Sequence, residues 1–211
     1  MNLLESKRTS IAFLSLFHSL TRALACLSFF SLRKRVNVSL PEWLYDYETS
    51  LENAEFSTDE EMMDVAIEIS ARNVKEATGG PFGCAIFEKD PDTNKAKLVA
   101  VGANRVVPLC NSTIHGEMAA IQFAEKKLQS FSLRPSNTNK QYIMCTSCEP
   151  CAMCLGATFW AAPAEMICAA TKDDAEAIGF NEGPVCKYRV NDAFVVESIF
   201  WSIIGKLVDL H

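Results

Sequence analysis

Four cysteines recur at every third position in the stretch CTSCEPCAMC, which spans residues 145–154. Four thiolates at this spacing resemble the run that binds an iron–sulfur cluster, but in that run the proline follows the last cysteine. Here Pro150 precedes Cys151, and proline is favoured in the first turn of a helix. We therefore expect Cys151 and Cys154 at i and i+3 on one helical face, and Cys145 on a strand. The pattern favours two metal ligands from this stretch rather than four.

A metal held for catalysis needs a third protein ligand, because catalytic zinc is bound by three side chains and a water. His115 in TIHGEMAA is the candidate, and Glu117 can lie beside a metal without binding it. Each motif also has an ordinary interpretation: a helical histidine is usually a plain polar residue, and Cys-x2-Cys occurs in zinc knuckles and redox pairs. Together, His-x-Glu and Pro-Cys-x2-Cys match the signature of the zinc deaminases that act on nucleobases.

The composition of the chain restricts its partners. The 211 residues, 49% hydrophobic and 22% charged, suffice for one globular domain with an extension. A formal charge of −6 provides no overall basic field for nucleic acid, so small-molecule substrates are favoured. The nine cysteines indicate a reducing compartment, either the cytoplasm or an organelle.

The N-terminal part has a different composition. Residues 11–32 are apolar, but His18 and Arg22 interrupt the run, so it makes a poor transmembrane helix. Basic residues ahead of the run are typical of a signal peptide, and the Arg- and Ser-containing, acid-poor composition is equally typical of an organellar transit peptide. A plain surface extension is the third interpretation. We predict an N-terminal extension over residues 1–56, with possible targeting function, and a catalytic domain over residues 57–211.

Periodicity predicts alternating helices and strands in the second part of the chain. Helices are expected at 57–78, 112–129 and 149–162, and strands at 82–90, 96–107, 140–146 and 164–171. The first two strands form an antiparallel hairpin around Pro91, and the second helix is capped near Ser112 or Thr113. The tail from Tyr188 is expected to hold one more strand and a closing helix. Such alternation produces a sheet with helices on both faces.

Residues 57–183 resemble the cytidine deaminase-like superfamily and, within it, the guanine or guanosine deaminase branch. The resemblance rests on GGPFG (79–83), GANRVV (102–107), HGE (115–117), TSCEPCAMCLGA (146–157) and IGF (178–180). It implies an α/β fold, a three-layer α/β/α sandwich with a mixed central sheet. It also implies a homodimer with one zinc ion per active site and a purine base or nucleoside as substrate.

Catalytic roles follow from the matched positions. Zinc held by His115, Cys151 and Cys154 would make its bound water nucleophilic near neutral pH. Glu117 would carry a proton from that water to a ring nitrogen and would finally protonate the leaving amine, so that a carbonyl forms and ammonia departs. Backbone N–H groups at the start of the helix after Pro150 would stabilise the developing negative charge.

Substrate residues are implied by the same resemblance. Asn104 is expected to hydrogen-bond the base, and Phe82 and Trp160 are expected to line the pocket and stack on or flank the ring. For the two aromatic residues the ordinary alternative is core packing. For Asn104 the alternative is a turn residue.

Three features depart from the guanine deaminase pattern. That branch has two acids after GF, the second of which contacts the purine. Here the residues are Asn181 and Glu182, so the second acid is kept but is one methylene longer. Gly116 is familiar from fungal-type cytosine deaminases, whereas guanine deaminases usually have alanine, so cytosine is the alternative substrate. The tail beyond Gly183 does not align well with the swapped C-terminal segment of the family.

Other functions remain as alternatives. A tRNA adenosine deaminase would share the zinc ligands but would need a basic surface for the RNA backbone, and the clearest basic run here is residues 33–35. A zinc-folded partner subunit that stabilises an active deaminase would be expected to lack the proton-carrying carboxylate, yet Glu117 is present. An iron–sulfur protein would be brown and contain iron.

Overall fold

The computed structural model describes residues 36–134, 139–180 and 196–198. Contacts divide the chain into residues 1–37 and 38–211, and the elements named below belong to the second unit. None of the described helices is long and apolar enough to cross a membrane. The apolar run at 11–32, whose interpretations were a signal peptide, a transit peptide or a plain extension, lies outside the described residues.

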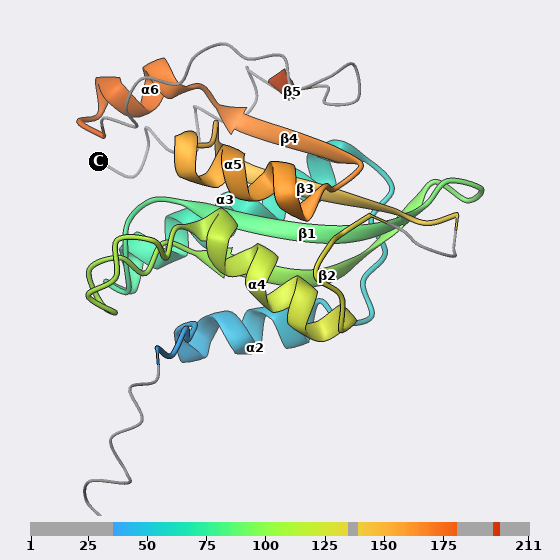
Figure 1. The fold of residues 1–211 in the computed structure, drawn as a ribbon, viewed down its shortest axis with the longest axis horizontal. Helices are drawn as coiled ribbons and strands as arrows, with labels where there is room; N and C mark the ends of the chain where they lie inside the picture. The colour runs from blue at the N-terminus through green and yellow to red at the C-terminus, as the bar shows by residue number, and fades with distance from the viewer. Residues whose placement is uncertain (1–35, 135–138, 181–195, 199–211) are drawn as a thin grey trace, which may run out of the picture. The chain divides into compact units, whose positions relative to one another are not determined.

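A five-stranded mixed sheet occupies the centre, with strand order β2-β1-β3-β4-β5 (Figure 1). The strands are β1 (Gly83–Asp90), β2 (Lys95–Ala103), β3 (Gln141–Cys148), β4 (Glu165–Ala170) and β5 (Val196–Ser198). β1 pairs antiparallel with both β2 and β3, whereas β3 and β4, and β4 and β5, are parallel. The predicted mixed sheet and its first hairpin are confirmed.

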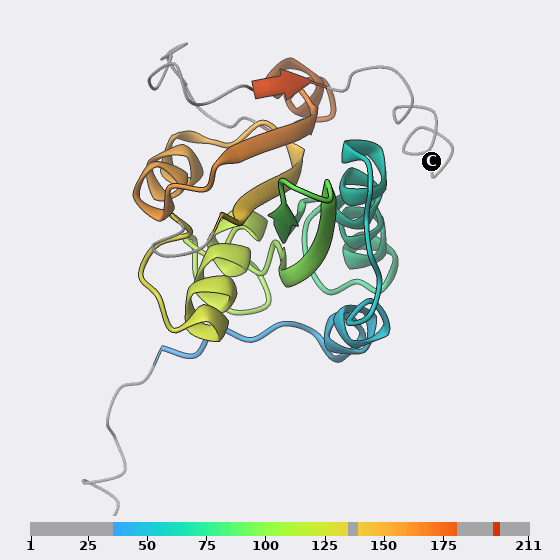
Figure 2. The same cartoon turned by 90° about the vertical axis from the view of Figure 1, so that its right-hand side faces the viewer.

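Helices cover both faces of this sheet, with α3 on one side and α4 and α5 on the other (Figure 2). The helices are α2 (Glu42–Ser50), α3 (Asp59–Lys75), α4 (Gly116–Leu128), α5 (Ala152–Ala161) and α6 (Lys172–Ala177). Successive side chains of a strand point to opposite faces. Ala85 and Phe87 therefore join the core under α3, while Cys84 and Ile86 join the core under α4. This arrangement is the predicted three-layer α/β/α sandwich.

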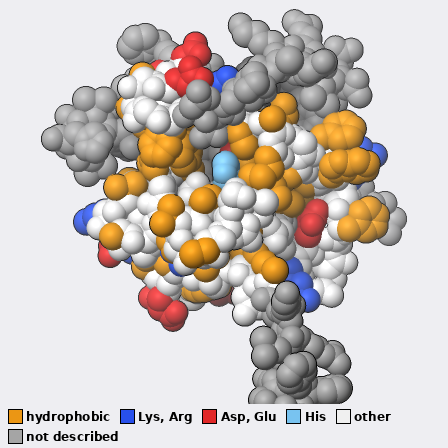
Figure 3. Space-filling model, turned by 60° about the vertical axis from the view of Figure 1, so that its left-hand side comes forward, with side chains coloured by type: hydrophobic (Ala, Val, Ile, Leu, Met, Phe, Trp, Pro, Cys, Tyr) orange, Lys and Arg blue, Asp and Glu red, His pale blue; other side chains and the backbone are white. Residues whose placement is uncertain are grey.

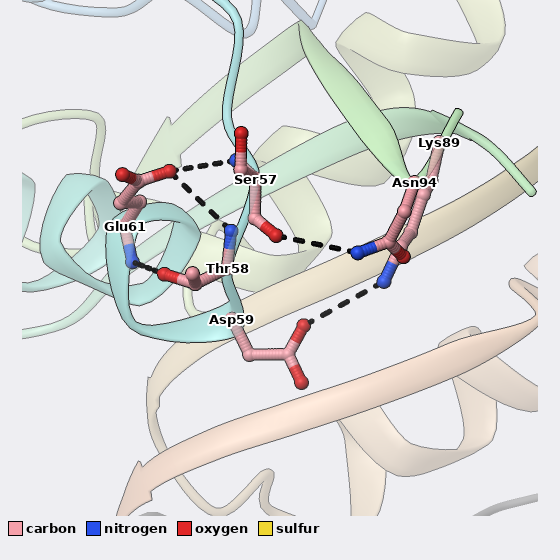
Figure 4. A network of polar contacts seen from close by, with 6 residues as sticks. All are labelled: Ser57, Thr58, Asp59, Glu61, Lys89 and Asn94. Carbon is pink, nitrogen blue, oxygen red and sulfur yellow. Dashed lines mark hydrogen bonds and ion pairs between the residues drawn. The ribbon is translucent and has the colours of Figure 1, made fainter.

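The start of α3 is fixed by reciprocal hydrogen bonds (Figure 4). The Thr58 hydroxyl accepts from the Glu61 amide at 3.2 Å, and the Glu61 carboxylate accepts from the Thr58 amide at 3.3 Å. Such a capping box satisfies N–H groups that the first turn of a helix leaves without partners. Asp59 also lies 3.9 Å from the Lys89 ammonium of β1, which ties the helix start to the sheet. The predicted helix start at residues 57–61 is confirmed.

Residues 38–56 precede the boundary that we predicted at residue 57. Leu44 of α2 is fully buried, in the same core as Met63 and Ile69 of α3. The backbone of Phe56 pairs with that of Ala96 on β2. The start of the catalytic domain at residue 57 stays a prediction, and residues 38–56 pack on the core of that domain.

Two helices begin later than the sequence predicts. α4 is capped by His115 rather than by Ser112 or Thr113. The reason is a local turn, because the Asn111 side chain accepts hydrogen bonds from the Thr113 amide at 3.0 Å and the Thr113 hydroxyl at 2.8 Å. α5 is likewise capped by Cys151 and not by the residue before Pro150. Of the predicted tail elements, β5 is present, and the closing helix falls outside the described residues.

Candidate active site

The end of β2 and the start of β1 lie beside the start of α4. A Cβ on Gly102 of β2 would lie 2.1 Å from the Gly116 carbonyl oxygen, so only glycine lets the strand approach the helix this closely. A Cβ on Gly116 would lie 3.2 Å from the Phe82 carbonyl oxygen at the start of β1. The Arg105 amide donates to the Ile114 carbonyl at 2.9 Å. The stretch that follows β2 is thereby held next to His115.

His115, Cys151 and Cys154 bring their ligand atoms within 4.8 Å of one another, the one such group of three among the described residues. The Cys151 Sγ and His115 Nδ1 atoms are 3.7 Å apart. Tetrahedral zinc, with a Zn–S bond of about 2.3 Å and a Zn–N bond of about 2.0 Å, requires a separation of about 3.5 Å between these atoms. The donor set and its spacing therefore fit zinc. Figure 3 shows a histidine reaching the surface between hydrophobic side chains, and His115 is the one histidine of the described residues.

Both helices point their N-termini at this group, because His115 is the N-cap of α4 and Cys151 is the N-cap of α5. A helix N-terminus favours negative charge. The pKa of Cys151 is lowered to about 4, first by the hydrogen bond with the Cys154 side chain and further by His115, against the effect of burial. The same hydrogen bond, together with burial, raises the pKa of Cys154. Zinc would be bound by both sulfurs as thiolates, so its binding would release protons from this pair.

Glu117 lies in the first turn of α4 and is 6% exposed. Burial is the main cause that raises the pKa of its carboxyl, opposed by its own backbone N–H and by His115. Glu117 is not a member of the ligand group, although its carboxyl interacts with the Cys154 side chain. A buried carboxyl with a raised pKa beside a metal position is suited to proton transfer near neutral pH.

The other two cysteines of CTSCEPCAMC lie on β3 and point elsewhere. Cys145 is fully buried in the core under α3. The Cys148 thiol contacts the Thr171 carbonyl at 3.6 Å, at the start of α6. Neither sulfur belongs to the ligand group. Four convergent thiolates, as an iron–sulfur cluster requires, are not formed by this part of the described chain.

Two of the predicted substrate residues lie at this site. The backbone N–H of Asn104 donates to the backbone carbonyl of Phe82 at 2.9 Å, and both residues are partly buried. The Phe82 ring meets the Phe180 ring edge to face, with centroids 5.1 Å apart. The Asn104 Oδ1 accepts from the Val106 amide at 3.3 Å. Within the described residues its side-chain N–H group has no hydrogen-bond acceptor, which leaves that donor for a ligand.

The other two predicted substrate residues are not placed there. Trp160 is 79% exposed on α5 and pairs with Phe159, with ring centroids 5.7 Å apart. It follows Cys154 by almost two helical turns, about 9 Å along the axis. Its role in the pocket therefore stays a prediction. Glu182 falls outside the described residues.

Sequence reasoning missed Asn73 of α3. The apolar residue beside it in the sequence, Val74, is 49% exposed, whereas Asn73 is fully buried. Asn73 continues the i, i+3, i+4 spacing from Met62 through Ile69, and a polar residue at a stripe position is the signal that could have revealed it.

Comparison with known proteins agrees with this geometry. Residues 56–170 match the model of the cytidine and deoxycytidylate deaminase zinc-binding region. Guanine deaminase of Bacillus subtilis (strain 168) is 37% identical over 122 residues, which are 58% of this chain and 70% of that protein. Guanine deaminase from Nitrosomonas europaea has a similar structure, with a TM-score of 0.67 and 31% identity over 79% of this chain and 90% of that one. A protein crystallised with 2,6-diaminopurine gives a TM-score of 0.64 and 34% identity over 74% of this chain and 78% of its own.

The matched region contains the residues that meet at the site, namely Phe82, Asn104, His115, Glu117, Cys151 and Cys154. It covers more than half of the chain, and the relatives confirm the resemblance to the guanine deaminase branch. The chain therefore belongs to the zinc-binding cytidine and deoxycytidylate deaminase family.

Proposed function

We propose that this protein is a zinc-dependent hydrolytic deaminase of a purine base or nucleoside, of the guanine type. It replaces an exocyclic amine by a carbonyl and releases ammonia. One observation carries the proposal: a buried carboxyl, Glu117, lies beside three side chains whose spacing fits zinc. The similarity to two guanine deaminases supports the purine substrate.

The residues of the chain divide the chemistry between them. His115, Cys151 and Cys154 would hold zinc, which supplies a Lewis acid that makes water nucleophilic near neutral pH. Glu117 accepts one proton from the attacking water and delivers it to the ring nitrogen. It then takes the second proton, from the hydroxyl that the attack leaves on the ring carbon, and delivers it to the departing amine. The N–H groups in the first turns of α4 and α5 face the negative charge that develops during attack.

Recognition of the base is assigned to Asn104 and Phe82. The Asn104 side chain keeps a donor for the edge of a base, and the backbone of Phe82 lies beside the start of α4. Gly116 now has a packing reason, because the Phe82 carbonyl would be only 3.2 Å from a Cβ at this position. Glycine relieves this tight contact, so packing against Phe82 is a second reason for a glycine here, beside the cytosine alternative.

Ammonia release from a panel of bases tests the substrate. Protein purified under reducing conditions without chelator is incubated with guanine, guanosine, cytosine, cytidine and adenine. We expect release from guanine or guanosine at a rate at least about a hundredfold above that from cytosine, because a pocket that hydrogen-bonds one base leaves buried polar groups unpaired with another. Release from cytosine alone would select the pyrimidine alternative, and no release from any base would favour the partner-subunit alternative.

We also propose that the protein is a homodimer whose interface includes Trp160. Phe159 and Trp160 form an aromatic pair on α5 that is largely exposed in the single chain. Exposed aromatic pairs of this kind are typical of association surfaces, where tryptophan is enriched among the residues that dominate affinity. A partner chain covering α5 would bury this pair close to the site, which would reconcile the exposure of Trp160 with its predicted role in the pocket.

Sedimentation velocity of two matched variants tests the dimer. Trp160→Ser is expected to weaken dimerisation by about thirtyfold or more, the effect of losing a dominant interface aromatic. Phe131→Ser is the control, because Phe131 is 92% exposed but lies in the segment after α4. A monomeric wild type, or equal behaviour of the two variants, would contradict the proposed interface.

A further inference from the structure

We propose that α2, which precedes the family-matched region, orients the base-binding residue Asn104 through a chain of hydrogen bonds. The chain runs from Trp43 through Thr78 and Asn73 to Asn104. Trp43 and Asn73 are then positioning residues for the reaction, acting on the base through Asn104. This inference rests on the proposed function, because it requires that Asn104 binds the base.

Asn73 is the centre of the chain. Its side chain is fully buried, and its Nδ2 donates to the Asn104 carbonyl at 2.9 Å and to the Gly80 carbonyl at 2.8 Å. Its Oδ1 accepts from the Thr78 hydroxyl at 2.8 Å. Both the oxygen and the nitrogen of the buried side-chain amide therefore have hydrogen-bond partners. Loss of these partners would destabilise the folded protein. One side chain of α3 thus holds both the segment before β1, at Gly80, and the segment after β2, at Asn104.

The direction of the chain is set at Trp43. An indole N–H is a donor only, and it donates to the Thr78 hydroxyl oxygen at 3.0 Å. The hydroxyl hydrogen of Thr78 must then point away from Trp43. Asn73 Oδ1, 2.8 Å from the Thr78 hydroxyl oxygen, is the nearest acceptor. With the amide oxygen so occupied, Asn73 Nδ2 must face the two carbonyls. The Asn73 backbone carbonyl, 3.4 Å away, is the other acceptor within reach of this hydroxyl.

The indole itself is held in place by stacking. The Arg72 guanidinium of α3 lies 4.6 Å from the centre of the Trp43 ring and 5.6 Å from that of Tyr47. Such cation–π contacts fix an aromatic ring on a helix surface. The Trp43 donor is therefore fixed in direction by contacts that do not depend on its N–H group.

A second set of contacts ties the same loop to the metal ligands. The Arg105 guanidinium donates to the Thr78 carbonyl, and the Arg105 amide donates to the Ile114 carbonyl beside His115. A Cβ on Gly79 would lie 1.9 Å from the Asn104 carbonyl oxygen, so the glycine permits a close crossing of the two backbones. Disturbing Asn73 is expected to shift Asn104, while the zinc ligands stay fixed by α4 and α5.

The expected signature is therefore a rise in KM with little change in kcat. Trp43→Phe keeps a ring over Arg72 and removes the donor. We expect the KM for guanine to rise about five- to tenfold, as the loss of one neutral hydrogen bond would produce. kcat should change by less than about twofold, because Glu117 and the zinc ligands are untouched. Zinc content measured on the same samples should not change.

Variants of Thr78 distinguish positioning from general destabilisation. Thr78→Val matches the shape of threonine but removes the hydroxyl, and should raise KM as Trp43→Phe does. Thr78→Ser keeps the hydroxyl and should retain the wild-type KM. Thr49→Ala is the matched control on α2, because the Thr49 hydroxyl donates to the Tyr45 carbonyl at 2.8 Å outside the chain of contacts. It should leave KM unchanged.

The outcomes separate this inference from the proposed function. Wild-type KM in both Trp43→Phe and Thr78→Val would overturn the inference while leaving the deaminase proposal intact. A parallel fall of kcat, zinc content and thermal stability would also overturn it, since that pattern marks a purely structural role. If the wild type turns over a different base, the same comparison is made with that base. Absence of turnover of every base would refute both proposals.

Discussion

Replacing Glu117 by glutamine is expected to lower kcat by about three to four orders of magnitude while zinc remains bound. Glutamine has the shape of glutamate but cannot carry protons, and positioned acid–base groups contribute about 10²–10⁴ to a rate. The upper end applies because one carboxylate handles every proton transfer in the proposed mechanism. Ammonia release measures the rate, and elemental analysis of the same sample measures the zinc content.

Zinc should survive this change because Glu117 lies outside the ligand group formed by His115, Cys151 and Cys154. The fold should survive as well, since a neutral amide replaces a buried carboxyl whose pKa is raised by burial. Glu125→Gln is the matched control on α4, facing partly toward solvent, and should keep the wild-type kcat. Loss of zinc in Glu117→Gln would make Glu117 a ligand, and retained turnover would remove it from the mechanism.

The elements that position this site were largely predictable from local patterns. The hairpin of β1 and β2 followed from alternating apolar residues around a turn, and the start of α3 followed from Ser57 and Thr58 ahead of three acids in the first turn. These signals act between neighbours in the sequence. They are strong because the same residues also satisfy the tertiary packing.

The helix starts next to the metal were less predictable, and the reason bears on the chemistry. An N-cap residue usually bonds the first turn through a side-chain oxygen, which is why Ser112 and Thr113 were expected as caps. His115 and Cys151 occupy the cap positions without any side-chain cap hydrogen bond. Their backbones are extended, with φ and ψ of −76° and 167° and of −66° and 170°. The side chains can thereby face each other as metal ligands.

Contacts between distant segments could not be predicted in this way. Asn73 can be buried because its side chain donates hydrogen bonds to the carbonyls of Gly80 and Asn104. Asn104 is 31 positions from Asn73 in the sequence. α2 is a short polar helix whose place depends on Leu44 in the core and on Trp43 at Thr78. The exposure of Trp160 likewise depends on what the fold leaves uncovered, a property that periodicity does not encode.

Replacing Cys151 by serine is expected to remove zinc from the protein, with a loss of turnover of at least about a thousandfold. Catalytic zinc needs three protein ligands, and a serine hydroxyl is a poor substitute for a thiolate. This substitution should not disturb α5, because Cys151 is the N-cap of that helix and serine is among the best N-cap residues. The helix should therefore stay formed while the metal is lost.

Cys148→Ser is the matched control from the same stretch of sequence. Cys148 is buried at the end of β3, and its thiol contacts the Thr171 carbonyl rather than the ligand group. A serine there can make the same contact, so zinc content should stay at about one ion per chain. Adding zinc after chelation should restore the wild type and Cys148→Ser but not Cys151→Ser.

The two variants test which cysteines of CTSCEPCAMC bind zinc and which do not. If Cys148→Ser lost zinc together with Cys151→Ser, Cys148 on β3 would also be a zinc ligand. The assignment of Cys151 and Cys154 as the only ligands from this stretch would then be wrong. If Cys151→Ser kept both zinc and turnover, the ligand group would be incidental. Retention in one variant and loss in the other requires that the metal is held by the two helix starts, where His115 and Cys151 meet.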